Sequence, residues 1–379
     1  MENANLSSMV NNAQPCANSS QAMGRADALR TTSVGKSKMK RPSLRILAVT
    51  NVYPSDDAPA SGTFVEQQLK GLRQIGLNVD VMVVDRLERG MSCYLGLGRK
   101  VQARMVSCQP DLVHVMYGGV MADMVTRAVG DVPTVVSFCG SDLLGELLSG
   151  PVRKFVSRYG VMASHKAARR ATGIIVKSQN LRDALPNHVD HSKVRIIPNG
   201  IDLERFRPLS QETCRARLGW NANHFHVLFP TNGGDPVKRP HLARSAIDRV
   251  IRSGIPAELH YLCGVAHDEV PLWLNASDSL LLTSLHEGSP NIVKEALACN
   301  IPIVSVDVGD VRERVQGIDG CYIALAESGD LATKLSLVHN SSRRVSARVK
   351  MHALSLERIA RRLKEVYEEI LSSKKEQPV

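Results

Sequence analysis

Two carboxylates eight residues apart, Glu287 and Glu295, have the clearest potential for chemistry in this chain. Glu287 begins a short turn, and Glu295 lies about one turn inside the helix that we expect to follow. Carboxylates accept paired hydrogen bonds from vicinal hydroxyl groups, and the free amides at a helix start bind anions such as a diphosphate. The pattern predicts a site for a ligand with hydroxyl and phosphate groups. The alternative is a solvated surface pair.

The turn and the helix start supply the remaining contacts that we expect with this ligand. Pro close to a first helical turn favours a helix that begins there. In a parallel sheet such turns lie at the carboxyl edge, where ligands bind. The expected contact residues are Gly288, Ser289, Pro290, Asn291 and Ile292.

A second glycine-containing loop precedes the basic pair Lys238 and Arg239. Gly233 and Gly234 allow the backbone to approach a ligand closely. Lys238 is a cation suited to stabilise the negative charge on a departing diphosphate, so we assign it a catalytic role. The alternative is a solvated lysine at a helix start.

The first half of the chain holds weaker candidates. Gly62 and Thr63 open a predicted helix, and their amides could contact a phosphate or a second substrate; the alternative is an ordinary glycine turn. Adjacent loop carboxylates such as Asp56 and Asp57 are usually solvated, so we predict no metal site there. His114, at a strand end, is assigned to the acceptor side of the site or to a structural role.

Composition restricts the class of protein. The chain has 379 residues, a formal net charge of +11 and only 4% aromatic residues, which predicts two domains with aliphatic cores and anionic partners. No apolar run approaches the ~20 residues of a membrane span. Eight scattered cysteines without CxxC pairs, and no secretory signal, predict a cytoplasmic protein with reduced thiols. Sparse aromatic residues argue against nucleic-acid binding.

Strand and helix patterns alternate along most of the chain. Residues 1–43 lack any period and are predicted to be a disordered leader. Alternation then runs from residue 44 and restarts after a break at 196–208, where the turn-forming residues are Pro198, Asn199, Gly200 and Pro208. This predicts an α/β protein with two parallel sheets. The predicted segments are 44–205, an acceptor domain; 206–353, a donor domain; and 354–379, a C-terminal helix and tail. This amphipathic helix is expected either to pack on the second domain or to cross back to the first.

The stretch from Glu287 to Val304, with the segment 273–278 before it and 308–313 after it, resembles the donor-binding signature of the family 4 glycosyltransferases. The likeness extends over nearly all of residues 44–370 and is greatest to bacterial enzymes of the exopolysaccharide and teichuronic-acid type. It implies a GT-B fold of two facing Rossmann-like domains, a nucleotide-diphosphate sugar as donor, retention of anomeric configuration and no metal or other cofactor. It also implies that Glu295 binds the donor ribose and that Glu287 lies beside the transferred sugar.

Two departures from the family pattern affect the expected site. The family usually has an arginine a few residues before the lysine that matches Lys238. This chain has no arginine between Phe225 and Lys238, and Arg239 is the substitute that we expect. The family commonly has a histidine before Gly-x-Asp, and this chain has Cys139, which cannot act as an imidazole. Asp142 is the remaining polar member of that segment and a catalytic candidate. Cys139 and Asn199 are expected on the acceptor side or in structural roles.

Residues 151–171 form a basic stretch with interleaved apolar residues, which predicts contact with an anionic membrane surface and suits a lipid-linked acceptor. The alternative is a solvated basic helix. For the whole chain we predict a glycosyltransferase of the hexosyl type (EC 2.4) that acts on a glycan or lipid-linked acceptor in polysaccharide synthesis. The other hypotheses are a sugar-nucleotide-binding protein without turnover and a GT-B epimerase.

Overall fold

The computed structural model describes residues 43–55, 58, 61–146, 150–231, 235–341 and 343–375. The predicted leader, apart from Ser43, lies outside the described residues. So do the pair Asp56 and Asp57 and the glycines Gly233 and Gly234.

Six parallel strands in the first half of the chain form one sheet, in the order β2-β1-β3-β4-β5-β6. The strands are short and rich in Val, Ile and Leu, as expected for a sheet covered on both faces. Their bounds are β1 Arg45–Thr50, β2 Asn78–Val83, β3 Leu112–Val115, β4 Thr134–Phe138, β5 Gly173–Val176 and β6 Val194–Ile196.

Five parallel strands in the second half form the other sheet, in the order β11-β10-β9-β7-β8. Strand order reverses beside β9, so the turns after β7 and β9 lie next to each other at the carboxyl edge. The bounds are β7 Phe225–Pro230, β8 Ala257–Leu262, β9 Ser279–Leu282, β10 Ile303–Val306 and β11 Tyr322–Ala324.

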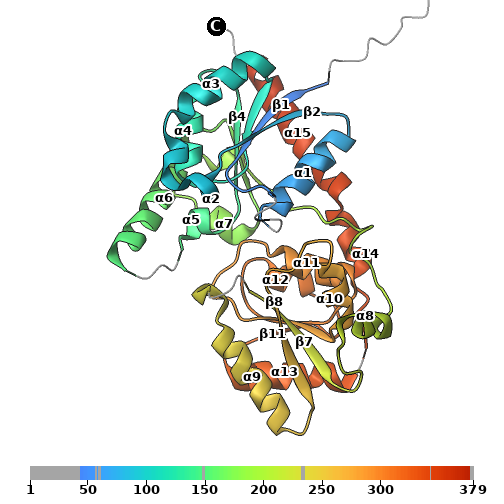
Figure 1. Ribbon diagram of the computed structural model, residues 1–379. Coiled ribbons are helices and arrows are strands. Elements are labelled where there is room, and N and C mark those ends of the chain that lie inside the picture. Colours follow the sequence, from blue (N-terminus) through green and yellow to red (C-terminus); the bar gives the residue numbers. More distant parts are fainter. Residues whose placement is uncertain are drawn as a thin grey trace, which may run out of the picture. The chain divides into compact units, whose positions relative to one another are not determined.

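Helices connect the strands of both sheets (Figure 1). Those of the first half are α1 Thr63–Gln74, α2 Arg86–Arg89, η1 Gly90–Tyr94, α3 Leu97–Cys108, α4 Gly119–Ala128, α5 Ser141–Leu144, α6 Pro151–Arg170, α7 Gln179–Asp183 and η2 His191–Lys193. Those of the second half are α8 Gln211–Leu218, η3 Pro236–Lys238, α9 Pro240–Arg252, α10 Val270–Ala276, α11 Asn291–Ala298, α12 Val311–Val315, α13 Ser328–Ser341, α14 Arg348–Met351 and η4 His352–Leu354.

The last helix, α15 Leu356–Lys375, returns to the six-stranded sheet and runs beside α1 (Figure 1). Tyr367 of α15 is buried, and its hydroxyl lies 2.6 Å from Nδ1 of His114 on β3. Glu369 pairs with Arg195 of β6 at 2.5 Å. Of the two positions considered for this helix, the crossing back to the first half is therefore the observed one.

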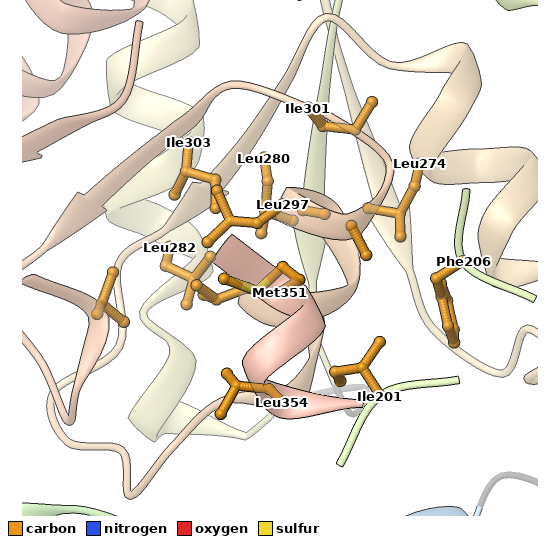
Figure 2. Close-up of a cluster of buried hydrophobic side chains, with 14 of the residues drawn as sticks. Ile201, Phe206, Leu274, Leu280, Leu282, Leu297, Ile301, Ile303, Met351 and Leu354 are labelled. Carbon is orange, nitrogen blue, oxygen red and sulfur yellow. The ribbon is translucent and has the colours of Figure 1, made fainter. Parts of the chain in front are cut away.

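A core of aliphatic side chains holds α11 against the second sheet. Figure 2 shows Leu297 of α11 close to Leu280 and Leu282 of β9, with Met351 of α14 on the other side of the cluster. All four side chains are buried. Since α11 is fixed by this packing, the turn that precedes it has a defined position.

The predicted alternation of strands and helices and the two parallel sheets are confirmed. The elements that were not predicted include α3, whose apolar residues form only a narrow stripe, β6, which has three residues, and α8, which is mostly polar. Several short helices, such as α7 and α12, were not predicted either. The domain limits near residues 205 and 353 stay a prediction, although the first sheet ends at Ile196 and the second begins at Phe225.

Candidate functional site

The turn between β9 and α11 carries the predicted carboxylate Glu287 at the carboxyl edge of the second sheet. Pro290 precedes the first helical residue, Asn291, so the first amides of α11 have no partner within the helix. Thr283, directly after β9, donates a hydrogen bond through Oγ1 to the carbonyl of Lys238 at 2.6 Å. That bond joins the two loops that the sequence predicted to act together.

Lys238 and Glu287 form an ion pair, with Nζ and Oε1 2.5 Å apart. Ser284 also donates to Oε1 of Glu287, at 2.8 Å. Both charged side chains are partly exposed, so they remain accessible to a ligand. The prediction of a solvated lysine, given as the alternative for Lys238, does not fit this pairing.

A cavity of about 820 Å³ lies in front of this pair and is lined from both halves of the chain. Its size suits a ligand larger than a simple sugar. The second half contributes Asp235, Pro236, Val237, Lys238, His286, Glu287, Gly288, Ser289, Pro290 and Asn291. The first half contributes Phe64, Tyr117, Cys139, Gly140, Ser141, Gly145, Glu146 and Asn199.

Gly288 packs closely against the first half of the chain at this site. A Cβ atom at this position would overlap the carbonyl oxygen of Cys139, far inside van der Waals contact. Asn180 of α7 donates a hydrogen bond through Nδ2 to the carbonyl of Glu287 at 2.9 Å. The turn therefore needs glycine at 288 because backbone from the first half occupies the space of a side chain.

Lys294 is a buried lysine that contacts the turn from the helix α11. The sequence analysis did not single it out. Its Nζ donates to Oγ of Ser289 at 3.1 Å and to the carbonyl of Asn199 at 3.3 Å, and Ser289 donates to Asp310 at 2.8 Å. Burial lowers the pKa of Lys294 to about 7, although the nearby carboxylate of Asp310 opposes the shift. The charge of this lysine therefore changes within the physiological pH range.

Asp142, predicted as catalytic, has its carboxylate engaged by the backbone of its own loop. It accepts hydrogen bonds from the amides of Gly118 at 2.9 Å, Cys139 at 3.0 Å and Gly140 at 2.8 Å. Burial raises the pKa of Asp142, and these amide bonds act against that shift. Asp142 does not line the 820 Å³ cavity. Asp142 lines the smaller cavity that adjoins it. The geometry shows that it shapes the loop, and its direct catalytic role stays a prediction.

Cys139 lines the cavity, and burial raises the pKa of its thiol to about 12. The thiol is therefore neutral and cannot serve as the cation that a histidine would provide. Lys177, at the carboxyl end of β5, is buried nearby; its Nζ donates to Oε1 of Gln68 at 3.4 Å. Burial lowers the pKa of Lys177 as well, and interactions with Cys139 and Asp142 partly offset the shift.

Glu295 differs from the prediction that both carboxylates face one ligand. Its side chain is buried and lies 3.1 Å from Nε2 of His267, and it is absent from the lining of the cavity. Nδ1 of the same imidazole lies 2.9 Å from Arg205 and 3.2 Å from Gln67. In this structure the carboxylate of Glu295 is therefore covered by a histidine, whereas Glu287 is partly exposed and lines the cavity.

Arg239, the expected substitute for the missing arginine, has its guanidinium bound to backbone carbonyl groups. Its guanidinium donates to the carbonyl of Thr283 at 2.5 Å and of Ser284 at 3.2 Å, and Arg239 is not part of the cavity lining. Its backbone has a φ of 51°, the left-handed region that a non-glycine residue rarely adopts. The bonds to the end of β9 hold the Arg239 side chain outside the cavity lining.

Three other predicted residues lie beside the site. Gly62 has a φ of 66°, and a Cβ there would overlap the backbone of Val52, so a glycine is required at the start of α1. Gly62 and Thr63 do not line the cavity, but the next residue, Phe64, does. Ile292 packs against the hydrophobic core.

Two predicted polar residues of the first half, His114 and Asn199, differ in whether they line the cavity. His114 is fully buried between Tyr367 and Ser137, and burial lowers its pKa to about 3, so it is a neutral structural residue. Asn199 lines the cavity and donates to Oδ1 of Asn291 at 3.3 Å. Oδ1 of Asn199 is buried and has no hydrogen-bond partner among the described residues.

A smaller cavity of about 160 Å³ adjoins the first and shares Tyr117, Ser141 and Glu146 with it. Phe155 and Tyr159 of α6 also line it. On the same helix, the predicted basic stretch, apolar side chains are exposed to solvent, among them Val152 at 74% and Phe155 at 69%. None of the described helices has the length and apolar character needed to cross a membrane.

Sequence reasoning missed Lys177, Lys294, His267 and Asp310 as members of the site. A polar residue directly after a buried strand was an available signal for Lys177. Lys294 stands on the buried face of a helix among apolar residues, where a charged residue is rare unless it has a partner. His267 and Asp310 come from separate loops. Only the tertiary structure places His267 beside Glu295 and Asp310 beside Ser289.

Known proteins match both halves of the chain. Residues 59–205 match the family described as Glycosyltransferase Family 4, and residues 224–340 match the family described as Glycosyl transferases group 1. A putative teichuronic acid biosynthesis glycosyltransferase, TuaC of Bacillus subtilis, is 25% identical over 71% of this chain and 82% of its own length. A D-inositol 3-phosphate glycosyltransferase of Streptomyces bingchenggensis is 26% identical over about half of each chain, 46% and 47%.

Solved structures share the fold. Sucrose-phosphate synthase from Thermosynechococcus elongatus superposes with a TM-score of 0.70 at 16% identity, covering 87% of this chain and 100% of that one. The Anabaena protein HepE in complex with UDP and glucose gives 0.65 at 18% identity, covering 86% and 100%. The fold alone does not separate transferases from other enzymes, since a UDP-GlcNAc 2-epimerase from Methanocaldococcus jannaschii gives 0.55 at 9% identity, covering 86% and 100%.

The sequence families make the distinction that the fold cannot. They match 147 residues in the first half and 117 in the second, from 59 to 205 and from 224 to 340, so together they span most of the chain. The predicted fold class, two Rossmann-like α/β halves, is confirmed by the two parallel sheets and by the structural likeness. This chain is a glycosyltransferase, an enzyme of the EC 2.4 type, and belongs to the family 4 glycosyltransferases with the GT-B fold.

Proposed function

We propose that the protein transfers a sugar from a nucleotide-diphosphate sugar to a glycan or lipid-linked acceptor, with retention of anomeric configuration. The observation that carries the proposal is the Lys238–Glu287 pair at the start of α11, in the wall of an 820 Å³ cavity. Lys238 and the free amides of α11 are suited to a diphosphate. The polar atoms of Glu287 and Asn199 are suited to sugar hydroxyl groups, and Oδ1 of Asn199 lacks a partner among the described residues.

The proposed reaction occurs on one face of the sugar. The acceptor hydroxyl attacks the anomeric carbon as the bond from that carbon to the diphosphate oxygen breaks on the same side. The hydroxyl proton passes to the departing diphosphate oxygen. Lys238 and the α11 amides stabilise the charge that develops on the leaving group, a contribution of about 3 to 4 kcal/mol per well-placed donor. The proposal requires no cofactor besides the donor.

Glu295 has a second part in this proposal. For it to bind the ribose hydroxyl groups, as the family resemblance implies, its carboxylate must exchange His267 for the ligand. The 3.1 Å contact between Glu295 and His267 would then be replaced in the complex.

We propose the smaller cavity and α6 as the acceptor side. The cavity adjoins the donor cavity, and its lining includes Phe155 and Tyr159 of α6. Exposed apolar residues on α6 alternate with Arg153, Lys154 and Arg158, an arrangement suited to an anionic membrane surface at the cytoplasmic face. The name of the Bacillus relative supports a role in cell-surface polysaccharide synthesis, although it fixes neither sugar nor acceptor.

The decisive experiment measures transfer. A thermal-shift screen against UDP-, GDP- and ADP-sugars identifies the donor, and nucleotide release is then followed with and without a bacterial lipid extract. NMR of the product linkage gives the anomeric configuration. Acceptor-dependent release with retention is expected. An inverted linkage would refute the retaining mechanism. Donor binding without transfer to any acceptor offered would contradict the proposal and favour a binding protein without turnover.

Membrane contact is tested by sedimentation with vesicles. We expect the protein to pellet with phosphatidylglycerol vesicles at low salt and to release at high salt, because basic residues supply the attraction. The variant F155D should pellet less. Val106→Asp is the matched control, since Val106 is also exposed, at 78%, but lies on α3. Equal sedimentation of the two variants would exclude α6 as the contact.

A further inference from the structure

Three potential metal-ligating side chains converge on the second sheet, away from the donor cavity. His226 belongs to β7, and Glu258 and His260 belong to the neighbouring edge strand β8. In the parallel register His226 is opposite Glu258, and Glu258 and His260 are two residues apart on one face of the strand. The three side chains therefore lie on the same side of the sheet.

The ligand atoms of these residues form a small triangle. Nδ1 of His226 lies 2.8 Å from Nε2 of His260. Oε2 of Glu258 lies 3.6 Å from Nε2 of His260 and 3.9 Å from Nδ1 of His226. Two ligands of a tetrahedral zinc ion, each about 2.0 to 2.1 Å from the metal, are about 3.3 Å apart. The observed separations lie on both sides of that value, so small movements of the side chains would give a metal site.

The hydrogen bond from His226 to Asn221 determines which ring nitrogen of His226 carries the lone pair that a metal would use. Nε2 of His226 lies 2.7 Å from the carbonyl oxygen of Asn221, and a carbonyl only accepts, so this nitrogen carries the proton. In the neutral ring Nδ1 then has its lone pair directed at the triangle. Metal-bound histidines commonly donate their other ring N–H to a carbonyl in this way.

The other two members are also held in place. The ring of Trp220 stacks on His260, with centroids 3.6 Å apart and planes 10° from parallel. Glu258 uses its second oxygen, Oε1, to contact Nδ1 of His224. The His226 side chain is fully buried, but that of Glu258 is 39% exposed, which gives an ion a path from solvent.

We propose that His226, His260 and Glu258 bind a divalent transition-metal ion of the zinc class, with water as the fourth ligand. Two imidazoles and one carboxylate suit zinc and its neighbours, whereas magnesium and calcium prefer oxygen ligands. The site lies toward the amino ends of β7 and β8, and the donor cavity lies at the carboxyl ends of the strands. The ion would therefore link the edge strand β8 to β7. Because Trp220 stacks on His260, it would also hold the segment around Trp220 against the sheet.

This assignment departs from the family-based expectation that the protein needs no metal. No zinc-like spacing is visible in the sequence because His226 and His260 are 34 residues apart and meet only through strand pairing. The alternative is a metal-free hydrogen-bonded pair of imidazoles, in which His260 donates to Nδ1 of His226.

The test uses the full chain without a histidine tag, stripped with a chelator and titrated with Zn²⁺ and, as a spectroscopic probe, Co²⁺. We expect one tightly bound ion by elemental analysis, a visible Co²⁺ spectrum of a four-coordinate site, and a Tm that rises with Zn²⁺ concentration. His260→Gln and Glu258→Gln should each weaken binding at least about tenfold. His352→Gln is the matched control because His352 is exposed and distant in the sequence.

Near-UV circular dichroism and a cooperative denaturant unfolding transition establish that each variant is folded. Three outcomes would overturn the proposal: no stoichiometric binding by the wild type, unchanged affinity in folded His260→Gln, or a near-ultraviolet thiolate-to-cobalt band, which would place the ion at a cysteine. Because none of these measurements uses sugar transfer, failure here is independent of the proposed function.

Discussion

The loop between β4 and α5 and the turn between β9 and α11 face the same cavity, and they differ in which charged groups remain free for a ligand. In the first, Asp142 is engaged by the amides of Gly118, Cys139 and Gly140. In the second, Glu287 and Lys238 pair with each other but remain partly exposed in the cavity wall.

The difference suggests that the two regions have different roles, one in shaping the cavity and the other in binding charge. The loop of Asp142 supplies a rigid backbone surface, against which Gly288 packs. The turn of Glu287 supplies charge and free helix amides. Substitutions in the second region should therefore affect transfer more than stability, and substitutions in the first should affect stability more than transfer.

The largest effect is expected for Lys238→Met. Loss of the cation should lower kcat about 10²- to 10³-fold with little change in Tm, because a donor to the developing charge contributes mainly in the transition state. Steady-state nucleotide release measures this. Lys100→Met, at an exposed position on α3, is the control. If kcat fell less than about threefold, the charge assigned to the turn would be wrong.

Glu287→Gln should also reduce kcat strongly, and the double variant with Lys238→Met should lose little more than the stronger single variant. Residues that act as a unit show non-additive losses. The same release assay gives all three values. Fully additive losses would mean that the 2.5 Å pair does not work as one unit.

A smaller effect is expected for Gly288→Ala, which tests the contact between the two regions. The new Cβ would overlap the Cys139 carbonyl, and overpacking of this kind costs about 1 to 3 kcal/mol. We expect kcat/KM to fall about tenfold. Gly329→Ala is the control, since nothing lies within 4 Å of a Cβ at that position. Unchanged kcat/KM would show that the two halves do not pack this closely during the reaction.

Asp142→Asn should mainly lower stability. The amide replaces one acceptor oxygen by an NH₂ group that faces backbone donors, at a cost of about 2 kcal/mol. Differential scanning calorimetry should show a Tm lower by several degrees, with kcat reduced far less than in Lys238→Met. Asp319→Asn, on the surface, is the control. A loss of kcat as large as that of Lys238→Met, with Tm unchanged, would support a direct catalytic role for Asp142.

The smallest effect concerns Lys294 and pH. Its pKa is about 7 in the folded protein and ordinarily 10.5, so between these two pH values the unfolded chain binds more protons and stability rises with pH. Relative to Lys294→Met, the wild type should gain about 1 kcal/mol of unfolding free energy from pH 7 to pH 8. Denaturant unfolding at the two pH values measures the difference. A constant difference would mean that Lys294 keeps its charge.

The sequence by itself determined the parts of this protein that are contiguous along the chain. The alternating strand and helix patterns predicted both parallel sheets, and the stretch from Glu287 to Val304 identified the family and the turn at the site. These succeeded because hydrophobic periodicity and turn residues are local signals.

Only the tertiary structure decided which side chains are free. Arg239 and Asp142 look available in the sequence, but their charges are bound by backbone groups, and Glu295 is covered by His267. Lys294, by contrast, looks like a surface residue and is buried under the turn. Burial and hydrogen-bond partners depend on packing between segments far apart in the chain, which no local pattern specifies.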